Sequence, residues 1–292
     1  MNTDLNITIV GMGLIGGSLF KAAQRAGYKV RGFDKNDAID IRQTDILLLD
    51  LPAEIIPGWF QKYADDLKQG AIIVDTCGIK SEICRALKPM VPPGCTFVGG
   101  HPMAGREVSG LAYAEADLFQ GASMLLTPYD DTDASVLELL YDFFGSLGFG
   151  QVLTTTPEHH DQMIAFTSQL GHVIAAAYTQ DQLSAEAAGY AAGSYANMTR
   201  IASMVPEAWD KLFSGNKKHL LAVLERFQER LESFRQALRD EDHQAIQTFI
   251  AAGARAKAND RVTRAHQAQF ASANCLGSYL KLTVLGASHA PA

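Results

Sequence analysis

The sequence predicts an α/β protein in which a doubly wound sheet is followed by an all-helical domain. Short β-branched or apolar runs alternate with helical patterns up to about residue 155. From Pro157 to about Gln269 the pattern is helical throughout, with alanine-rich stretches. A glycine-rich turn directly follows the first strand, as in a Rossmann-type sheet. We therefore divide the 292-residue chain into an N-terminal domain, residues 1–155, and a helical domain, residues 156–292.

Composition limits the classes of partner. A hydrophobic content of 47% and a charged content of 20% are typical of a globular protein. The net charge of −7, without a basic run, argues against nucleic acid or an anionic membrane as partner. No apolar run approaches the roughly 18 to 20 residues of a membrane-spanning helix, and no signal peptide is recognisable. The four cysteines, which show no metal or disulfide spacing, are Cys77, Cys84, Cys95 and Cys275. We expect a cytoplasmic protein whose partner is a small molecule.

The first strand, residues 6–10, leads into a G-x-G-x-x-G motif and a helix through Ala26. Gly11 permits the tight turn, and Gly13 lets backbone N–H groups approach a pyrophosphate at the helix N-terminus. Gly16 lets the helix pack closely against the strand. This context predicts a dinucleotide-binding loop formed by Gly11, Met12, Gly13, Leu14, Ile15 and Gly16.

Asp34 closes the second strand, residues 29–33. An acid about 20 residues after the glycines hydrogen-bonds the adenosine ribose hydroxyls and repels a 2′-phosphate, so NAD is favoured over NADP. Lys35 beside it weakens that preference, and a turn-forming aspartate is the alternative. Asp75, at the end of the fourth strand, is a further candidate for cofactor binding.

The connection from Asp34 to the third strand, residues 45–52, leaves little room for a crossover helix. The remaining elements of the first domain are read from alternating patterns. They are a helix at 53–67, a strand at 71–74, a helix from Ser81, a strand at 96–98, a strand at 122–127, a helix at 134–147 and a strand at 150–154.

His101 is the leading candidate for catalysis. It lies in Gly-Gly-His-Pro-Met-Ala-Gly-Arg-Glu, residues 99–107, where the fifth strand is expected to end in a glycine turn. Pro102 fixes the following backbone and presents the imidazole at the mouth of the sheet. A histidine there can exchange a proton near neutral pH.

In the helical domain, the segment 216–239 carries apolar residues at spacings of three and four and is predicted to form an amphipathic helix. Its apolar face either packs in the core or forms a subunit interface, and we expect an intertwined homodimer through this domain. The residues from Ala287 to Ala292 are expected to be disordered.

Two further residues of this domain are substrate-binding candidates. His172 follows Gly171, whose place in a helical pattern suggests a helix break or a close approach. Arg200 is a lone cation in a small, apolar segment, so it needs an anion. Either a structural carboxylate or a substrate carboxylate would serve.

These motifs together resemble the prephenate/arogenate dehydrogenase family of tyrosine biosynthesis, from about residue 6 to about residue 270. The resemblance is carried by the opening glycine motif and by Gly-His-Pro-Met-Ala-Gly around His101. It is also carried by Leu-Gly-His at His172 and by Thr-Arg-Ile-Ala at Arg200. Trp209 and Asn216 fit the same pattern.

The resemblance implies an NAD-dependent oxidative decarboxylation that needs no metal. His101 would accept a hydrogen bond from the ring hydroxyl and help remove its proton. Arg200 would bind a substrate carboxylate, and His172 would help to bind the substrate.

The chain departs from the family at three positions. Gly78 stands where many relatives have a serine that contacts the substrate hydroxyl and the catalytic histidine. Gln169 and Gly171 stand where histidine and proline are frequent.

Arg106 is a further substrate-binding candidate, although it could equally touch a cofactor phosphate.

Several rival functions stay open. Arogenate dehydrogenase differs only in an amino group on the substrate side chain. Other two-domain reductases lack the His101 loop. A sensor that binds the dinucleotide without turnover belongs to a different class.

Overall fold

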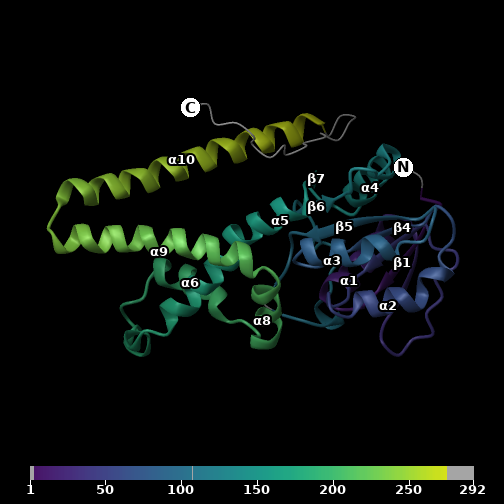
Figure 1. Cartoon of the computed structure of the whole chain (residues 1–292), viewed down its shortest axis with the longest axis horizontal. Coiled ribbons are helices and arrows are strands. Elements are labelled where there is room, and N and C mark those ends of the chain that lie inside the picture. The colour runs from purple at the N-terminus through teal and green to yellow at the C-terminus, as the bar shows by residue number, and fades with distance from the viewer. Residues whose placement is uncertain (1–2, 107, 275–292) are drawn as a thin grey trace.

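The computed structural model describes residues 3–106 and 108–274, with residues 261–274 described by their backbone alone. Glu107, Cys275 and the segment 287–292, expected to be disordered, lie outside the described residues. None of the described helices is long and apolar enough to span a bilayer. Figure 1 shows the sheet domain joined to a helical domain that ends in a long hairpin of α9 and α10.

The N-terminal domain is built on one seven-stranded sheet in the order β2-β1-β3-β4-β5-β6-β7. The first five strands are parallel, whereas β6 pairs antiparallel with β5, and β7 is parallel to β6. The strands are β1 (Asn6–Val10), β2 (Lys29–Phe33), β3 (Ile46–Leu49), β4 (Ile72–Asp75), β5 (Thr96–Pro102), β6 (Ser123–Thr127) and β7 (Gln151–Thr154).

Both faces of the sheet are covered by helices, as the apolar strands require. In β3, Ile46 and Leu48 face one core, whereas Leu47 and Leu49 face the other. The predicted alternation of strands and helices is confirmed, and no helix links β2 to β3. The helices of this domain are α1 (Leu14–Arg25), α2 (Ile56–Tyr63), α3 (Ser81–Leu87) and α4 (Ala134–Ser146).

The reversal of β6 was not predicted. Between β5 and β6 the chain folds over α1 without a crossover helix, and therefore returns antiparallel. Its short turn Leu111–Tyr113 lies on the outer side of α1, where a Cβ at Gly17 would meet the side chains of Leu111 and Ala114. This connection fixes α1 against the sheet.

The helical domain begins directly after β7, and no strand occurs in its described part. It contains α5 (Pro157–Ile164), α6 (Leu170–Thr179), α7 (Gly193–Thr199), α8 (Pro206–Gly215), α9 (Lys217–Arg239) and α10 (His243–Asn274). The helix predicted at 216–239 corresponds to α9. Its Leu220 and Val223 are buried, whereas Leu231 and Leu238 are exposed.

The irregularity suggested by Gly171 lies just before it. The five residues Ala165–Gln169 form a π-helical turn between α5 and α6, a feature common at functional sites. Gly171 itself is helical, and a Cβ on it would lie 3.6 Å from Ile201 Cδ1. The close approach of the turn Arg200–Ala202 to α6 is therefore made at this glycine.

Candidate active site

His101 lies at the carboxyl end of β5, but the two glycines before it do not form a turn. Gly99 and Gly100 pair with Thr127 and Leu126 of β6, so the predicted glycine turn is wrong. The glycines are needed for close packing instead, because a Cβ on Gly100 would lie 2.6 Å from the carbonyl oxygen of Asp75. His101 is therefore held by regular strand pairing on a rigid element.

The imidazole of His101 is connected to the helical domain by a relay of hydrogen bonds. His101 Nδ1 lies 2.9 Å from His160 Nε2, and His160 Nδ1 lies 2.8 Å from Asp161 Oδ1. Asp161 in turn accepts the backbone N–H groups of Lys80 at 2.7 Å and Ser81 at 2.8 Å. His160 and Asp161, in the first turns of α5, are buried.

Burial and charge define the protonation of this relay. Burial, with the neighbouring His160 and Lys80, lowers the pKa of His101 well below its ordinary value of 6.5. Burial also lowers the pKa of His160, although its bond to Asp161 opposes the shift. Burial alone would raise the pKa of Asp161, but the bonds from His160, Lys80 and Ser81 outweigh it and lower the pKa. Near neutral pH both imidazoles are therefore neutral, and Asp161 is a carboxylate.

These charge states assign the proton positions. A carboxylate can only accept, so His160 Nδ1 carries a proton and donates a hydrogen bond to Asp161. His160 Nε2 is then an acceptor, and His101 Nδ1 must be its donor. His101 Nε2 is left with a lone pair, which can accept a hydrogen bond from a hydroxyl group.

A buried ion pair holds the backbone beside His101. Lys80 Nζ binds the carboxylate of Asp75 and donates to the carbonyl oxygen of Gly100 at 2.6 Å. Asp75 Oδ1 accepts the N–H of Gly100 at 3.1 Å, so both backbone groups of that residue are fixed. The side chains of Lys80 and Asp75 are completely buried. The carboxylate of Asp75, a cofactor-binding candidate in the sequence, is occupied by Lys80 and Gly100 in this structure and positions β5.

The N-terminus of α1 fits a dinucleotide. Gly11 has a φ of +97°, and a Cβ there would overlap the carbonyl oxygen of Asp50. The cap residue Gly13 offers no side-chain cap, and the first turn of α1 carries no acid. The N–H groups of Leu14 and Ile15 have no intrahelical acceptor, so they are oriented for an anion such as a pyrophosphate.

The far side of this loop meets β2. Met12 packs over Gly32, where a Cβ would lie 2.6 Å from the sulfur of Met12. Gly11 N–H donates to the carbonyl oxygen of Phe33 at 2.8 Å, which places Asp34 next to the loop. Asp34 is exposed, and its carboxylate accepts the N–H of Lys35 at 2.8 Å. This position suits a contact with a ribose.

His172 and Arg200 belong to a second cluster, formed by α6, α8 and the turn Arg200–Ala202. The His172 ring stacks on Trp209, with centroids 3.9 Å apart. His172 Nδ1 donates to the carbonyl oxygen of Ser168 at 2.9 Å, which fixes the orientation of the ring. Arg200 is exposed, and its turn packs against α6.

Gly78 lies against α8, the helix that carries Trp209. A Cβ on Gly78 would lie 3.2 Å from Leu212 Cδ2, so a serine there would have to displace the leucine slightly. Gln169 donates to the carbonyl oxygen of Leu212 at 2.8 Å and accepts from Asn216 Nδ2 at 2.8 Å. It thus fastens the π-helical turn to α8 and α9.

Arg106 is engaged within the N-terminal domain. Its two terminal nitrogens bind the two carboxylate oxygens of Glu115 at 2.9 and 2.5 Å. The pair is exposed, so substrate or cofactor phosphate would have to compete with Glu115 for this guanidinium.

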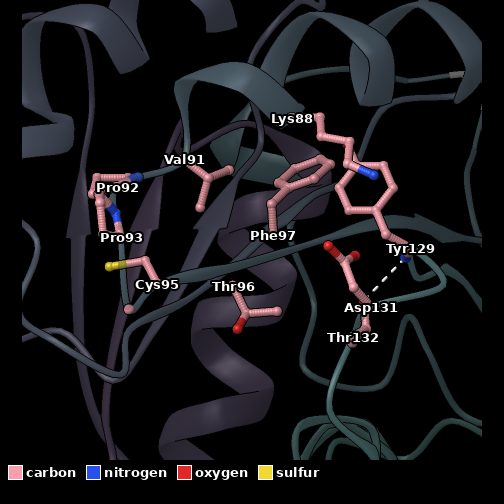
Figure 2. Close-up of a pocket in the computed structure, with 11 residues that line it drawn as sticks. Lys88, Val91, Pro92, Pro93, Cys95, Thr96, Phe97, Tyr129, Asp131 and Thr132 are labelled. Atoms are coloured by element: carbon pink, nitrogen blue, oxygen red, sulfur yellow. Dashed lines mark hydrogen bonds between the residues drawn. The ribbon is translucent and has the colours of Figure 1, made fainter.

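A separate pocket of about 280 Å³ opens at the opposite end of β5. Figure 2 shows Lys88 over the ring of Tyr129, with Nζ 4.4 Å from the centroid. The pocket is lined by Thr96 and Phe97, the first two residues of β5, whereas His101 lies next to the last residue of that strand. Its position excludes it as the site of chemistry at His101.

The sequence alone did not reveal His160, Asp161 or Lys80. The available signal was the run His-His-Asp at 159–161, directly after the helix start at Thr156 and Pro157. That run resembles any polar first turn. Only the fold shows that His160 and Asp161 are turned inward toward β5 and α3.

Comparison with known proteins identifies the family to which both domains belong. The profile of the prephenate dehydrogenase nucleotide-binding domain matches residues 14–153, and that of the prephenate dehydrogenase dimerization domain matches residues 156–252. The chain is 30% identical over 274 residues to a cyclohexadienyl dehydrogenase of Zymomonas mobilis, covering 83% of this chain and 91% of that protein. It is 27% identical over 263 residues to a prephenate dehydrogenase of Bacillus subtilis, covering 81% and 71%.

Solved structures share the fold. Aquifex aeolicus prephenate dehydrogenase, in complex with hydroxyphenyl propionate and NAD+, superposes with a TM-score of 0.76 at 24% identity, covering 87% of this chain and 97% of that one. Synechocystis arogenate dehydrogenase gives a TM-score of 0.76 at 24% identity, covering 87% and 99%. The two family profiles and the extent of the Zymomonas match decide the assignment: the chain belongs to the prephenate/arogenate dehydrogenase family of oxidoreductases.

Proposed function

We propose that the protein catalyses the NAD-dependent oxidative decarboxylation of prephenate to 4-hydroxyphenylpyruvate and CO2. Family membership supports a dehydrogenase of this type. The observation that carries the proposal is the relay at His101, which leaves an unprotonated Nε2 at the carboxyl end of β5. This end of a parallel sheet is where α/β enzymes bind ligands.

When bound, NAD+ supplies the acceptor for the hydride that leaves the hydroxyl-bearing ring carbon. The cofactor would be held by the loop from Gly11 to Gly16 and by Asp34, which fit its pyrophosphate and ribose.

In the proposed reaction, His101 Nε2 accepts the proton of the ring hydroxyl as that carbon is oxidised. The resulting carbonyl is conjugated to the carbon bearing the ring carboxylate, so loss of CO2 returns the electron pair to the carbonyl oxygen and makes the ring aromatic. The same histidine then returns its proton to that oxygen. His101 therefore takes up one proton and returns one proton in each turnover. His160 and Asp161 keep the His101 ring in place throughout.

Arg200 and His172 are proposed to bind the substrate. Prephenate carries two carboxylates, and a guanidinium can bind one of them through two hydrogen bonds. His172 is held against Trp209 by its Nδ1 bond to Ser168, which leaves Nε2 available for a contact with the substrate.

The active form is proposed to be a homodimer through the helical domain. The matching profile describes this part as a dimerization domain. The α9–α10 hairpin exposes several large apolar side chains, which a second copy would cover. They are Leu231, Leu238, Phe249 and Ile250.

The proposal is tested by following NADH formation with prephenate or arogenate and with NAD+ or NADP+. Turnover of prephenate with NAD+ supports it. Turnover restricted to arogenate would make the protein an arogenate dehydrogenase, the specificity named for the Synechocystis structure. Binding of NAD+ without turnover of either substrate would favour a dinucleotide sensor.

A further inference from the structure

A carboxylate occupies the base of the dinucleotide-binding loop. Asp50, the residue directly after β3, accepts the N–H of Gly16 through Oδ2 at 2.6 Å. Its other oxygen, Oδ1, accepts the hydroxyl proton of Thr76 at 2.6 Å. Asp50 therefore connects the first turn of α1 to the end of β4.

The Asp50 carboxylate lies close to where a pyrophosphate would bind. A Cβ on Gly13 would be 3.7 Å from Asp50 Oδ2, and a Cβ on Gly16 would be 2.9 Å from it. Gly13 caps α1, and the N–H groups that follow it are the expected anion donors. Asp50 and a bound pyrophosphate would thus share one helix N-terminus.

No cation neutralises Asp50 within the described part of the chain. The first turn of α1 contributes no charged side chain. The loop after β4 contributes Asp75 and Lys80, which neutralise each other, and the thiol of Cys77. Burial, followed by the charge of Asp75, raises the pKa of that thiol, so it stays neutral. Asp50 therefore depends on its two hydrogen bonds to stabilise its charge.

The buried environment of Asp50 favours its neutral, protonated form. Burial raises its pKa above the ordinary value of 3.8, and the bonds from Thr76 and Gly16 only partly oppose the shift. A pyrophosphate with two negative charges placed nearby would favour the neutral acid further.

We propose that ionised Asp50 weakens dinucleotide binding, and that binding is accompanied by the uptake of a proton at Asp50. This inference rests on the proposed binding of NAD at the Gly11–Gly16 loop. By linkage, a ligand that disfavours the carboxylate must bind more tightly as protons become available. Affinity should therefore rise as the pH falls toward the ionisation range of Asp50.

The experiment is isothermal titration calorimetry with ADP-ribose and with NAD+. ADP-ribose carries the pyrophosphate but lacks the charged nicotinamide. In the proposed site His101 acts at the nicotinamide end, so its protonation should affect the binding of ADP-ribose less than that of NAD+. Titrations from about pH 5 to pH 8 in buffers of different ionisation enthalpy give both affinity and the number of protons taken up. We expect ADP-ribose affinity to rise with falling pH, with proton uptake in the same range.

Three variants separate the contributions. Asp50→Asn removes the charge and keeps an oxygen for Gly16, so at pH 8 it should bind ADP-ribose about tenfold more tightly, with no proton uptake. Thr76→Val removes a bond that stabilises the carboxylate, so the pH midpoint of the wild-type response should move upward. Asp45→Asn, at the opposite end of β3 and paired with Lys68, is the matched control and should leave affinity unchanged.

The outcomes are distinguishable. Wild-type protein that binds neither NAD+ nor ADP-ribose at any pH would overturn the proposed cofactor site. Wild-type protein that binds both without proton uptake, or an Asp50→Asn variant with unchanged affinity and uptake, would overturn the role of Asp50 alone. If Asp50→Asn does not fold, the comparison of wild type with Thr76→Val still tests the proposal. An unchanged pH midpoint of ADP-ribose binding in Thr76→Val would contradict it.

Discussion

At the scale of single residues, the state of His101 is determined by groups on another element. His160 Nε2 accepts a hydrogen bond from Nδ1–H of His101, and Asp161 fixes the tautomer of His160. The catalytic lone pair is therefore oriented before substrate arrives, and it persists to low pH because burial disfavours the imidazolium.

The neutral state of His101 predicts how enzyme activity depends on pH. Protonated His101 cannot accept the hydroxyl proton, so activity should fall as the pH drops through the pKa of His101. Because that pKa is lowered, the acidic limb of kcat/KM should lie below pH 6.5. Steady-state rates measured between about pH 5 and pH 8 check this. An acidic limb centred at or above pH 6.5 would contradict it.

His160 offers a second test at the residue scale. His160→Leu removes the acceptor for His101 Nδ1–H, and we expect kcat to fall about a hundredfold while KM for NAD+ changes little. His160→Gln provides an amide oxygen as acceptor and should recover part of the loss. Equal activity of the two variants, both folded by circular dichroism, would show that the hydrogen bond is unimportant.

At the scale of elements, the ion pair of Lys80 and Asp75 connects β4, the turn before α3 and β5. Breaking a buried pair leaves an uncompensated charge, so Lys80→Met should lower the free energy of unfolding by about 3 to 5 kcal/mol. Lys68→Met is the control, because its partner Asp45 is partly exposed, and it should cost about 1 kcal/mol or less. Urea unfolding of both variants measures the difference, and similar losses would refute the special role of Lys80.

Features formed within a short stretch of the chain could be predicted from the sequence, whereas contacts between distant elements could not. The places of the glycine loop and of Asp34 in the fold were predictable, because strand, turn and helix follow one another within a short stretch. The relay was not, since His101 and His160 are 59 residues apart and Asp161 reaches the backbone of Lys80 from 81 residues away. The burial of Asp75 was not predictable either, because its position at a strand end says nothing of how deeply the side chain lies. The reversal of β6 likewise depends on a connection that carries no periodic pattern.

At the scale of the whole molecule, the α9–α10 hairpin (Figure 1) carries exposed apolar side chains that predict a dimer. Leu238 and Ile250 are 53% and 60% exposed in the single chain. The double variant Leu238→Glu with Ile250→Glu should be monomeric by light scattering coupled to size-exclusion chromatography, whereas the wild type should be dimeric. Ile55→Glu, which changes an equally exposed residue of the sheet domain, should remain dimeric. A dimer that survives the double variant would place the interface elsewhere.

The most direct test of the whole account is turnover of prephenate by wild type and by His101→Asn, with NAD+ affinity measured in parallel. We predict that the wild type releases NADH and CO2 in equal amounts. The variant should lose about 100-fold to 10,000-fold in kcat while binding NAD+ as tightly. A wild type without turnover of prephenate or arogenate, or a variant that keeps its activity, would contradict the assignment of His101 as the proton acceptor.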